Sequence, residues 1–344
     1  MIRLLALLAA LLMLAPLTLP AQAASFDCAK AATSFEKAIC ADPATSMQDE
    51  IMAQAYATAL GGLSEVAAAD VKAAQKSWLA YAERGCSEDA QPIAGEYNED
   101  QLQCLAGNFR SRIRDLEASH MQGGYRFYPL DRYLVEKDTE ALPEEFNKLA
   151  DKHYQIVKID RGDDIATAFN AAVDSIIAGQ GQAFFEPGTS QIAIGDVTSD
   201  YDITTKVSDV TSQRISLTTN EYWYGHGAAH GNYFIVHRHF LIGKKRLLEA
   251  SDIFEGDDWQ ARLGELALKQ VKAQLGEDYF AGSDDNIAPI AIDPLRWDFS
   301  EAGLIIQFNI YEVTAYAYGA PTITIPWSDL EWLVTDEADN IAGF

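Results

Sequence analysis

Apolar side chains recur at helical spacing in three consecutive segments of the first third of the chain. The first helix is expected at residues 42–60, because an Asp-Pro pair has the form of an N-cap followed by proline at the first helical position. The second is expected at residues 64–85. The third should begin near Asn98, where Gln101 completes the spacing of a capping box. Three helices joined by short connections predict a small all-α, antiparallel bundle within residues 24–118.

Beyond the bundle the pattern changes to short runs in which apolar and polar side chains alternate, as in half-buried strands. Strands are expected at residues 152–160, 201–207, 214–224, 233–242, 304–310 and 322–325. Amphipathic helices are expected at residues 161–178 and 259–275. Strands in series with two helices favour an α+β domain with a mainly antiparallel sheet at residues 146–344. Residues 119–145 show no clear periodicity and are expected to form a connector.

Residues 1–23 have the pattern of an export signal. One early positive charge, Arg3, precedes an apolar run over residues 4–15, and the segment closes with the small-x-small sequence Ala21-Gln22-Ala23. The apolar run is too short and too interrupted by proline to span a bilayer well. We therefore expect Sec export, cleavage after Ala23, and a periplasmic or secreted protein without a membrane anchor.

The four cysteines all lie within the predicted bundle, and an even number of cysteines in an exported chain indicates disulfides. They are Cys28, Cys40, Cys86 and Cys104. Four cysteines allow three pairings. We expect the local pairing, Cys28 with Cys40 and Cys86 with Cys104, because the helix pattern places each pair at the two ends of a short connection.

Acidic residues outnumber basic ones two to one: 51 Asp and Glu stand against 26 Lys and Arg, a formal net charge of −25. Removal of residues 1–23 takes away Arg3, which leaves 25 basic residues and a net charge of −26. Such an excess of acid argues against nucleic acid or an anionic membrane surface as a partner. It favours a basic partner, or serves only solubility.

The predicted bundle resembles a known family. The residues that carry the resemblance are Phe26-Asp27-Cys28-Ala29-Lys30-Ala31, Thr33, Glu36, Ile39-Cys40-Ala41-Asp42, Gln75, Trp78, Cys86, Cys104-Leu105 and Arg112. In order and spacing they resemble the LprI-type lysozyme-inhibitor domain, with Met47-Gln48-Asp49 where the family often has Leu-Asp. The resemblance covers about residues 25–118. It implies an exported helical domain that binds and inhibits lysozyme.

The second half is similar to another family. The matching residues are Tyr224-Gly225-His226-Gly227-Ala228-Ala229-His230-Gly231-Asn232-Tyr233, Gly243-Lys244, Asp252-Ile253-Phe254, Phe308, Tyr311-Glu312-Val313, Tyr316-Ala317, Gly319 and Ile325-Pro326-Trp327. They resemble DUF3298, a domain also found in the lysozyme-sensing anti-sigma factor RsiV. The position of His226 and the Ala228-Ala229 spacing differ from the usual Gly-Gly-Ala-His form. The resemblance spans about residues 150–335.

Four of the six histidines lie within 14 residues, at His226, His230, His237 and His239. On a strand, residues two apart share a face, so His237 and His239 are candidate metal ligands. A zinc-dependent hydrolase would also need a further ligand and a general base, for which Glu221 and Glu249 are available. The other interpretation is a tight hairpin turn with one structural histidine. No catalytic constellation is complete, so we expect neither an enzyme nor a cofactor.

We therefore expect an exported, non-enzymatic protein that binds lysozyme or another basic cell-wall hydrolase and blocks its cleft. The alternative is a module that binds peptidoglycan glycan through exposed aromatic rings. Candidate contact residues surround the glycine-rich turn at residues 225–231, and a second candidate loop is the acidic segment at residues 276–286. The contact candidates are His226, Gly227, His230, Tyr222 and Tyr224.

Overall fold

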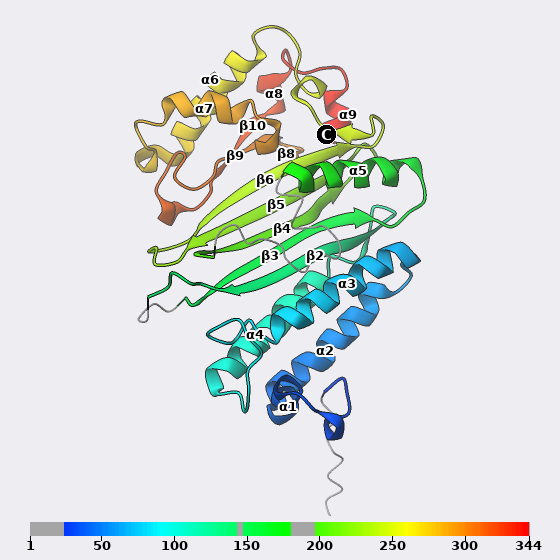
Figure 1. Ribbon diagram of the computed structural model, residues 1–344. Helices are drawn as coiled ribbons and strands as arrows, with labels where there is room; N and C mark the ends of the chain where they lie inside the picture. The colour runs from blue at the N-terminus through cyan, green and yellow to red at the C-terminus, as the bar shows by residue number, and fades with distance from the viewer. Residues whose placement is uncertain (1–23, 143–146, 180–196, 344) are drawn as a thin grey trace, which may run out of the picture.

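The structure is a computed structural model that describes residues 24–142, 147–179 and 197–343. The expected export signal at residues 1–23 lies outside these ranges. Figure 1 shows three tiers: a helical region, a central twisted sheet, and a C-terminal region of helices with a small second sheet. Among the described residues, no helix is long and apolar enough to cross a bilayer.

Four helices form the first tier: α1 (Ser34–Ala41), α2 (Pro43–Leu60), α3 (Glu65–Ala82) and α4 (Glu99–Leu116). Local chemistry fixes where they begin. At α1 the Thr33 hydroxyl accepts from the Glu36 amide while the Glu36 carboxylate accepts from the Thr33 amide, which is a capping box. Asn98 and Gln101 make the same reciprocal pair before α4, as predicted.

Two disulfides hold this region, Cys28–Cys40 and Cys86–Cys104, which confirms the predicted local pairing. The first joins the short N-terminal 3-10 turn to the end of α1. The second joins the segment after α3 to α4, so both bridges lie at helix connections.

The central sheet has seven strands in chain order: β1 (Met121–Gln122), β2 (Tyr125–Lys137), β3 (Leu149–Ile159), β4 (Ser199–Val210), β5 (Arg214–Gly225), β6 (Asn232–Leu241) and β7 (Arg246–Leu247). Every neighbouring pair is antiparallel except β3 and β4, which are parallel. Helix α5 (Asp164–Gly179) lies between these two strands in the chain, as a parallel pair requires. The predicted α+β class with a mainly antiparallel sheet is confirmed.

The third tier combines α6 (Trp259–Leu275), α7 (Asp284–Ala291), α8 (Trp327–Leu330) and α9 (Ala338–Ala342) with the strand order β10-β9-β8. The strands are β8 (Trp297–Ser300), β9 (Gly303–Gln307) and β10 (Thr322–Pro326). Helix α6 has the predicted bounds. The strand expected at residues 304–310 ends earlier, at Gln307.

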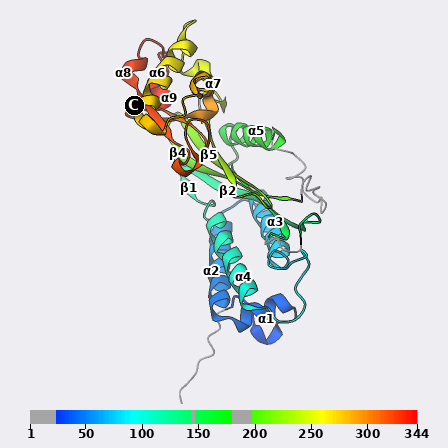
Figure 2. The ribbon, with the colours of Figure 1, turned by 90° about the vertical axis from the view of Figure 1, so that its left-hand side faces the viewer.

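Helices cover the two faces of the central sheet unequally. Helix α5 packs on one face, against Tyr154 and Ile156 of β3, whereas the helical region packs on the other (Figure 2). The C-terminal region lies on the same face as the helical region, over β6, where His239 bonds to the carbonyl of Trp297. Strand β4 therefore lies between the helical and C-terminal regions on this face.

The interpretation of residues 119–145 as a connector is wrong, because Met121–Gln122 form β1 and Tyr125–Lys137 form the 13-residue strand β2. Strand β2 is buried on both faces, so its sequence does not alternate between apolar and polar side chains. Its Tyr133 and Val135 pack in the core of the helical region, whereas Phe127 and Leu130 pack with α5. One hydrophobic core therefore includes both α3–α4 and the sheet. The domain boundaries expected at residues 118 and 146 stay predictions.

Candidate functional site

One row of side chains crosses the central sheet. Tyr133 of β2 pairs with His153 of β3, His153 with Asp202 of β4, Asp202 with Tyr222 of β5, and Tyr222 with Tyr233 of β6. Directly paired residues project from the same face of a sheet, so these five side chains lie on the face that the helical region covers. Of these five residues, only Tyr222 was expected from the sequence to be a contact residue.

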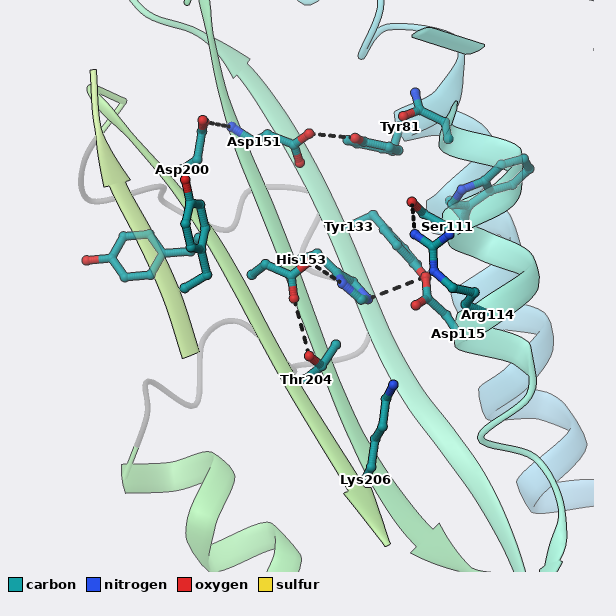
Figure 3. Close-up of a pocket in the computed structure, with 15 residues that line it drawn as sticks. Tyr81, Ser111, Arg114, Asp115, Tyr133, Asp151, His153, Asp200, Thr204 and Lys206 are labelled. Atoms are coloured by element: carbon teal, nitrogen blue, oxygen red, sulfur yellow. Dashed lines mark hydrogen bonds and ion pairs between the residues drawn. The ribbon is translucent and has the colours of Figure 1, made fainter. Parts of the chain in front are cut away.

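A pocket of about 440 Å³ lies over this row, between the sheet and helices α3 and α4 (Figure 3). The helices contribute Trp78, Tyr81, Asn108, Ser111, Arg114 and Asp115 to its lining. The sheet contributes Tyr133, Asp151, His153, Asp200, Tyr201, Asp202, Thr204, Lys206 and Tyr222. The lining thus combines carboxylates, cations and aromatic rings from the helical region, before residue 118, and from the sheet, after it.

His153 occupies the centre of the pocket wall, with its ring stacked on Tyr133 at a centroid distance of 4.5 Å. Its Nε2 lies 3.9 Å from carboxylate oxygens of Asp115 and Asp131, and its Nδ1 lies 3.6 Å from Asp202. Burial disfavours the imidazolium, but Asp131, Asp202 and Asp115 outweigh burial and raise the pKa of His153 to about 10. The ring is therefore charged at neutral pH.

Asp151, two residues before His153, forms a second polar centre of the same wall. The Tyr81 hydroxyl donates to its Oδ2 at 2.6 Å, and its backbone amide donates to Asp200 at 2.9 Å. Burial raises the pKa of Asp151 to about 6, and the negative charge of Asp200 adds to the rise. This carboxyl group titrates close to neutral pH.

A buried polar cluster links the helices and strands that form the walls of the pocket. Arg112 of α4 donates to Asp131 of β2 at 2.6 Å, to Gln75 of α3 at 3.0 Å and to the Tyr133 hydroxyl at 2.9 Å. Gln155 donates to the other carboxylate oxygen of Asp131. These contacts fix α3, α4 and β2 relative to one another, and so fix the walls of the pocket.

The predicted contact residue His226 is a buried anchor of the glycine-rich turn. Its side chain is only 3% exposed and lies between Asp138, at 2.5 Å, and Asp200, at 3.1 Å. Burial opposes protonation, but Asp138 and Asp200 outweigh it and raise the pKa of His226. Gly227 follows with φ of +78°, a conformation that glycine adopts without strain. Tyr224 donates to the carbonyl of Ala228 across the same turn.

The predicted contact residue His230 is exposed and belongs to a cluster of aromatic rings. Its Nε2 lies 2.9 Å from the Tyr311 hydroxyl, and its ring stacks on Tyr316 at 3.9 Å. Tyr311 is 49% exposed and adopts φ of +64°, a strained backbone for a tyrosine. Tyr233 contacts the ring of Tyr316 edge-on, and Tyr222 is 41% exposed beside Gly231. We call these five residues, Tyr222, His230, Tyr233, Tyr311 and Tyr316, the aromatic cluster.

The remaining candidates are held by internal contacts. His239 bonds to Ser216 through Nδ1 and to the carbonyl of Trp297 through Nε2, so both ring nitrogens already have partners. His237 bonds to Thr218. Among the described residues, no group of three or more His, Cys, Asp or Glu is arranged to hold a metal ion. In the acidic segment at residues 276–286, Asp284 pairs with Lys272 and accepts from Tyr279.

Sequence reasoning missed the acidic side of the pocket, formed by Asp115, Asp151 and Asp202 around His153. Isolated Asp and His residues in strands give no local signal. The distance between His153 and Asp202 depends on the register of the parallel strands β3 and β4. These strands are far apart in the sequence, with α5 between them. The charged residues of β2, such as Asp131 and Arg132, were one available signal of a polar cluster, because charged side chains in a buried strand need partners.

Comparisons with known proteins match two segments of the chain. The model of the family described as "Lysozyme inhibitor LprI" matches residues 28–116, and that described as "Protein of unknown function (DUF3298)" matches residues 251–328. No curated protein matches the chain.

Two solved structures, both of DUF3298 family proteins, are similar to this chain. The protein from Bacteroides fragilis NCTC 9343 is 18% identical, with a TM-score of 0.48 over 64% of this chain and 96% of its own. The protein from Pseudomonas aeruginosa PAO1 is 13% identical, with a TM-score of 0.45 over 64% of this chain and 98% of its own. The chain thus carries, in this order, a segment that matches the lysozyme inhibitor LprI family and a segment that matches the DUF3298 family.

Proposed function

We propose that this protein is an exported, non-enzymatic binding protein that inhibits a lysozyme by blocking its substrate cleft. The observation that carries the proposal is the match of residues 28–116 to the lysozyme-inhibitor family. At the level of the family, this match and the DUF3298 match support a lysozyme-inhibitor-like role. Binding of a particular lysozyme is the further step that we propose.

Export is supported by two features. Both disulfides join cysteines of the matched segment, and such bridges persist in oxidising compartments such as the periplasm or the extracellular space. Residues 1–23 have the sequence pattern of a cleaved signal, which we propose is removed after Ala23.

The net charge of −25 supports a basic partner. Many lysozymes are basic, and opposite charge accelerates association through long-range attraction that salt screens. Inhibition should therefore weaken as the salt concentration rises.

We propose that the aromatic cluster makes the contact, although it lies outside the matched residues 28–116. Exposed tyrosines supply large, rigid contact areas and are enriched among the residues that dominate binding energies. Here the rings are held in place, because His230 is bonded to Tyr311 and stacked on Tyr316. An ordered cluster loses little conformational freedom on binding, which favours affinity.

The test is a titration of the mature protein into a lysozyme turbidity assay, with chicken-type and other lysozyme classes at low and moderate salt. Stoichiometric inhibition that weakens with salt is the expected result. Absence of inhibition for every class would contradict the proposal. Retention on insoluble peptidoglycan with little salt dependence, without inhibition, would instead favour a glycan-binding module.

A further inference from the structure

Two histidines attach the glycine-rich turn at residues 225–231 to the rest of the protein. His226 lies near the start of the turn and is buried between Asp138, which follows β2, and Asp200 of β4. His230 lies near its end and belongs to the aromatic cluster. The turn therefore connects the end of the central sheet to the proposed contact surface.

Between these two histidines the turn is exposed and has little backbone pairing. The ladder between β5 and β6 ends at the pair of Trp223 and Asn232. Residues 227–229 are exposed, and the Tyr224 hydroxyl donates to the carbonyl of Ala228 at 3.2 Å. An exposed segment of this kind depends on the contacts at its two ends for its position.

The contacts of His226 engage both nitrogens of its ring. Nδ1 lies 2.5 Å from Oδ2 of Asp138, and Nε2 lies 3.1 Å from Oδ1 of Asp200. We call Asp138, His226 and Asp200 the histidine clamp. A neutral imidazole has one N–H and one lone pair, whereas an imidazolium has two N–H donors. The charged ring can therefore bond to both carboxylates, but the neutral ring can bond to only one and turns its lone pair towards the other.

The surroundings of the clamp favour the charged ring. The side chains of His226 and Asp138 are 3% and 2% exposed. Burial disfavours the imidazolium, but the hydrogen bonds to Asp138 and Asp200 outweigh burial and raise the pKa of His226. Titratable residues in direct contact with the clamp are Glu140, Lys148, Asp151 and Tyr224.

We propose that His226 is a positioning residue of the aromatic cluster: its charged ring, bonded to Asp138 and Asp200, fixes the glycine-rich turn and thereby His230. This inference rests on the proposed function, because it concerns the surface that we propose contacts the lysozyme. His226 is buried and acts on the partner without touching it. When the ring loses its proton at alkaline pH, one bond of the clamp breaks, the turn is held less firmly, and the affinity for the partner falls.

The first test follows the ring nitrogens of His226 by NMR, in the full mature chain with isotope-labelled histidine. We expect two protonated nitrogens at pH 7, and loss of one proton only above the ordinary pKa of 6.5. A neutral ring at pH 7 would overturn the proposal.

Two variants test the positioning itself. His226→Gln imitates the neutral ring, because an amide donates from its nitrogen and accepts at its oxygen. Asp138→Asn keeps the shape of the aspartate but removes its charge. In each variant the NMR contact between the rings of His230 and Tyr316, whose centroids lie 3.9 Å apart, should weaken. Persistence of this contact in both variants would overturn the proposal.

His120→Gln is the matched control. His120 is also bonded at both ring nitrogens, to the Glu117 carbonyl and to Gln122, but it lies beside β1 at the edge of the sheet. This variant should leave the contact between His230 and Tyr316 unchanged. Thermal unfolding verifies that all three variants remain folded.

The second test measures the dissociation constant for lysozyme by calorimetry at intervals from pH 7 to pH 10. The ratio of His226→Gln to the wild type at each pH cancels the titration of the lysozyme itself. The variant should bind about tenfold more weakly at pH 7, because an unfixed contact surface must be ordered on binding. The ratio should fall towards one where NMR shows that the wild-type ring loses its proton. A residue that only stabilises the fold would give a constant ratio across that range, and this result would overturn the proposal.

The two readouts separate this inference from the proposed function. If the wild type binds no lysozyme, the proposed function fails, and the contact between His230 and Tyr316 alone decides whether His226 positions the turn. If the wild type binds lysozyme and His226→Gln binds equally well at every pH, the positioning role fails and the proposed function stands.

Discussion

Arg112 of α4 and Asp131 of β2 form an ion pair of 2.6 Å in which both side chains are completely inaccessible to solvent. The pair joins the helical region to the central sheet, and Gln75 and the Tyr133 hydroxyl accept further hydrogen bonds from the guanidinium. Asp131 lowers the energy of the charged arginine, while Arg112 lowers the pKa of Asp131 against the effect of burial. Two charges that would be costly alone thus stabilise each other.

Removing one partner of this pair should strongly destabilise the protein. Arg112→Met removes the guanidinium that lies 2.6 Å from the buried Asp131 carboxylate, and breaking such a buried pair typically costs about 3–5 kcal/mol. Urea denaturation measures the change in the free energy of unfolding. The control is Arg262→Met, since Arg262 forms only exposed pairs with Asp258 and Glu265 and should cost about 1 kcal/mol or less. Equal losses for the two variants would contradict the structural role of the buried pair.

His153 should make stability depend on pH. Its pKa is about 10 in the folded protein against an ordinary value of 6.5, so its charge stabilises the fold fully below pH 6.5. This contribution is lost as the pH rises from 6.5 towards 10. The difference in unfolding free energy between the wild type and His153→Gln should therefore shrink over that range. Denaturation curves at intervals of pH check this, and a constant difference would show that the ring does not titrate as proposed.

The disulfide between Cys86 and Cys104 should contribute measurably to stability. It closes a loop of 18 residues, for which restriction of the unfolded chain predicts about 3 kcal/mol. The double variant Cys86→Ser, Cys104→Ser should lose about that much on thermal or urea unfolding. Adding a reductant should lower the stability of the wild type more than that of the double variant, which retains only the Cys28–Cys40 disulfide. An unchanged midpoint in the double variant would refute the prediction.

A methyl group at Gly231 should displace Tyr222. A Cβ at residue 231 would lie 2.4 Å from the Tyr222 hydroxyl oxygen, a distance that forces the ring to move. Because Tyr222 is partly exposed, the ring can swing outward, so Gly231→Ala should cost only about 1 kcal/mol of stability. A crystal structure of the variant should show the shifted ring. Gly243→Ala is the control, since nothing lies within 4 Å of a Cβ there.

Tyr311→Ala should weaken lysozyme inhibition if the aromatic cluster is the contact. Truncating a dominant interface tyrosine typically costs about 2 kcal/mol, or about thirtyfold in the inhibition constant. The matched control is Trp332→Ala, because Trp332 is 77% exposed and lies outside the cluster. Thermal unfolding of both variants verifies that they remain folded. Full inhibition by Tyr311→Ala would exclude the cluster as the contact.

Features set by neighbours in the chain were predictable from the sequence. Helix α2 begins after Asp42 because the Asp42 carboxylate accepts from the Thr45 amide, a contact between residues three apart. The pairing of the cysteines followed in the same way from adjacent helix ends.

Features set by distant contacts were not predictable. Strand β2 contains Pro129, Asp131 and Arg132, which interrupt the pattern of a strand. Asp131 is accommodated only because Arg112 reaches it from α4. The pocket likewise requires Asp115, from the end of α4, to meet His153 of β3. Nothing within a short window of sequence indicates that these residues meet.

The shared core of α3, α4 and β2 limits where this protein can be divided into independently folding fragments. Tyr128, Tyr133 and Val135 of β2 are buried together with Trp78 and Phe109 of the helices. A fragment ending at residue 118 would expose the apolar surface that β2 covers, and would be expected to aggregate. The helical region and the central sheet therefore share one buried interface, and a substitution at β2 will affect the helices that pack on it.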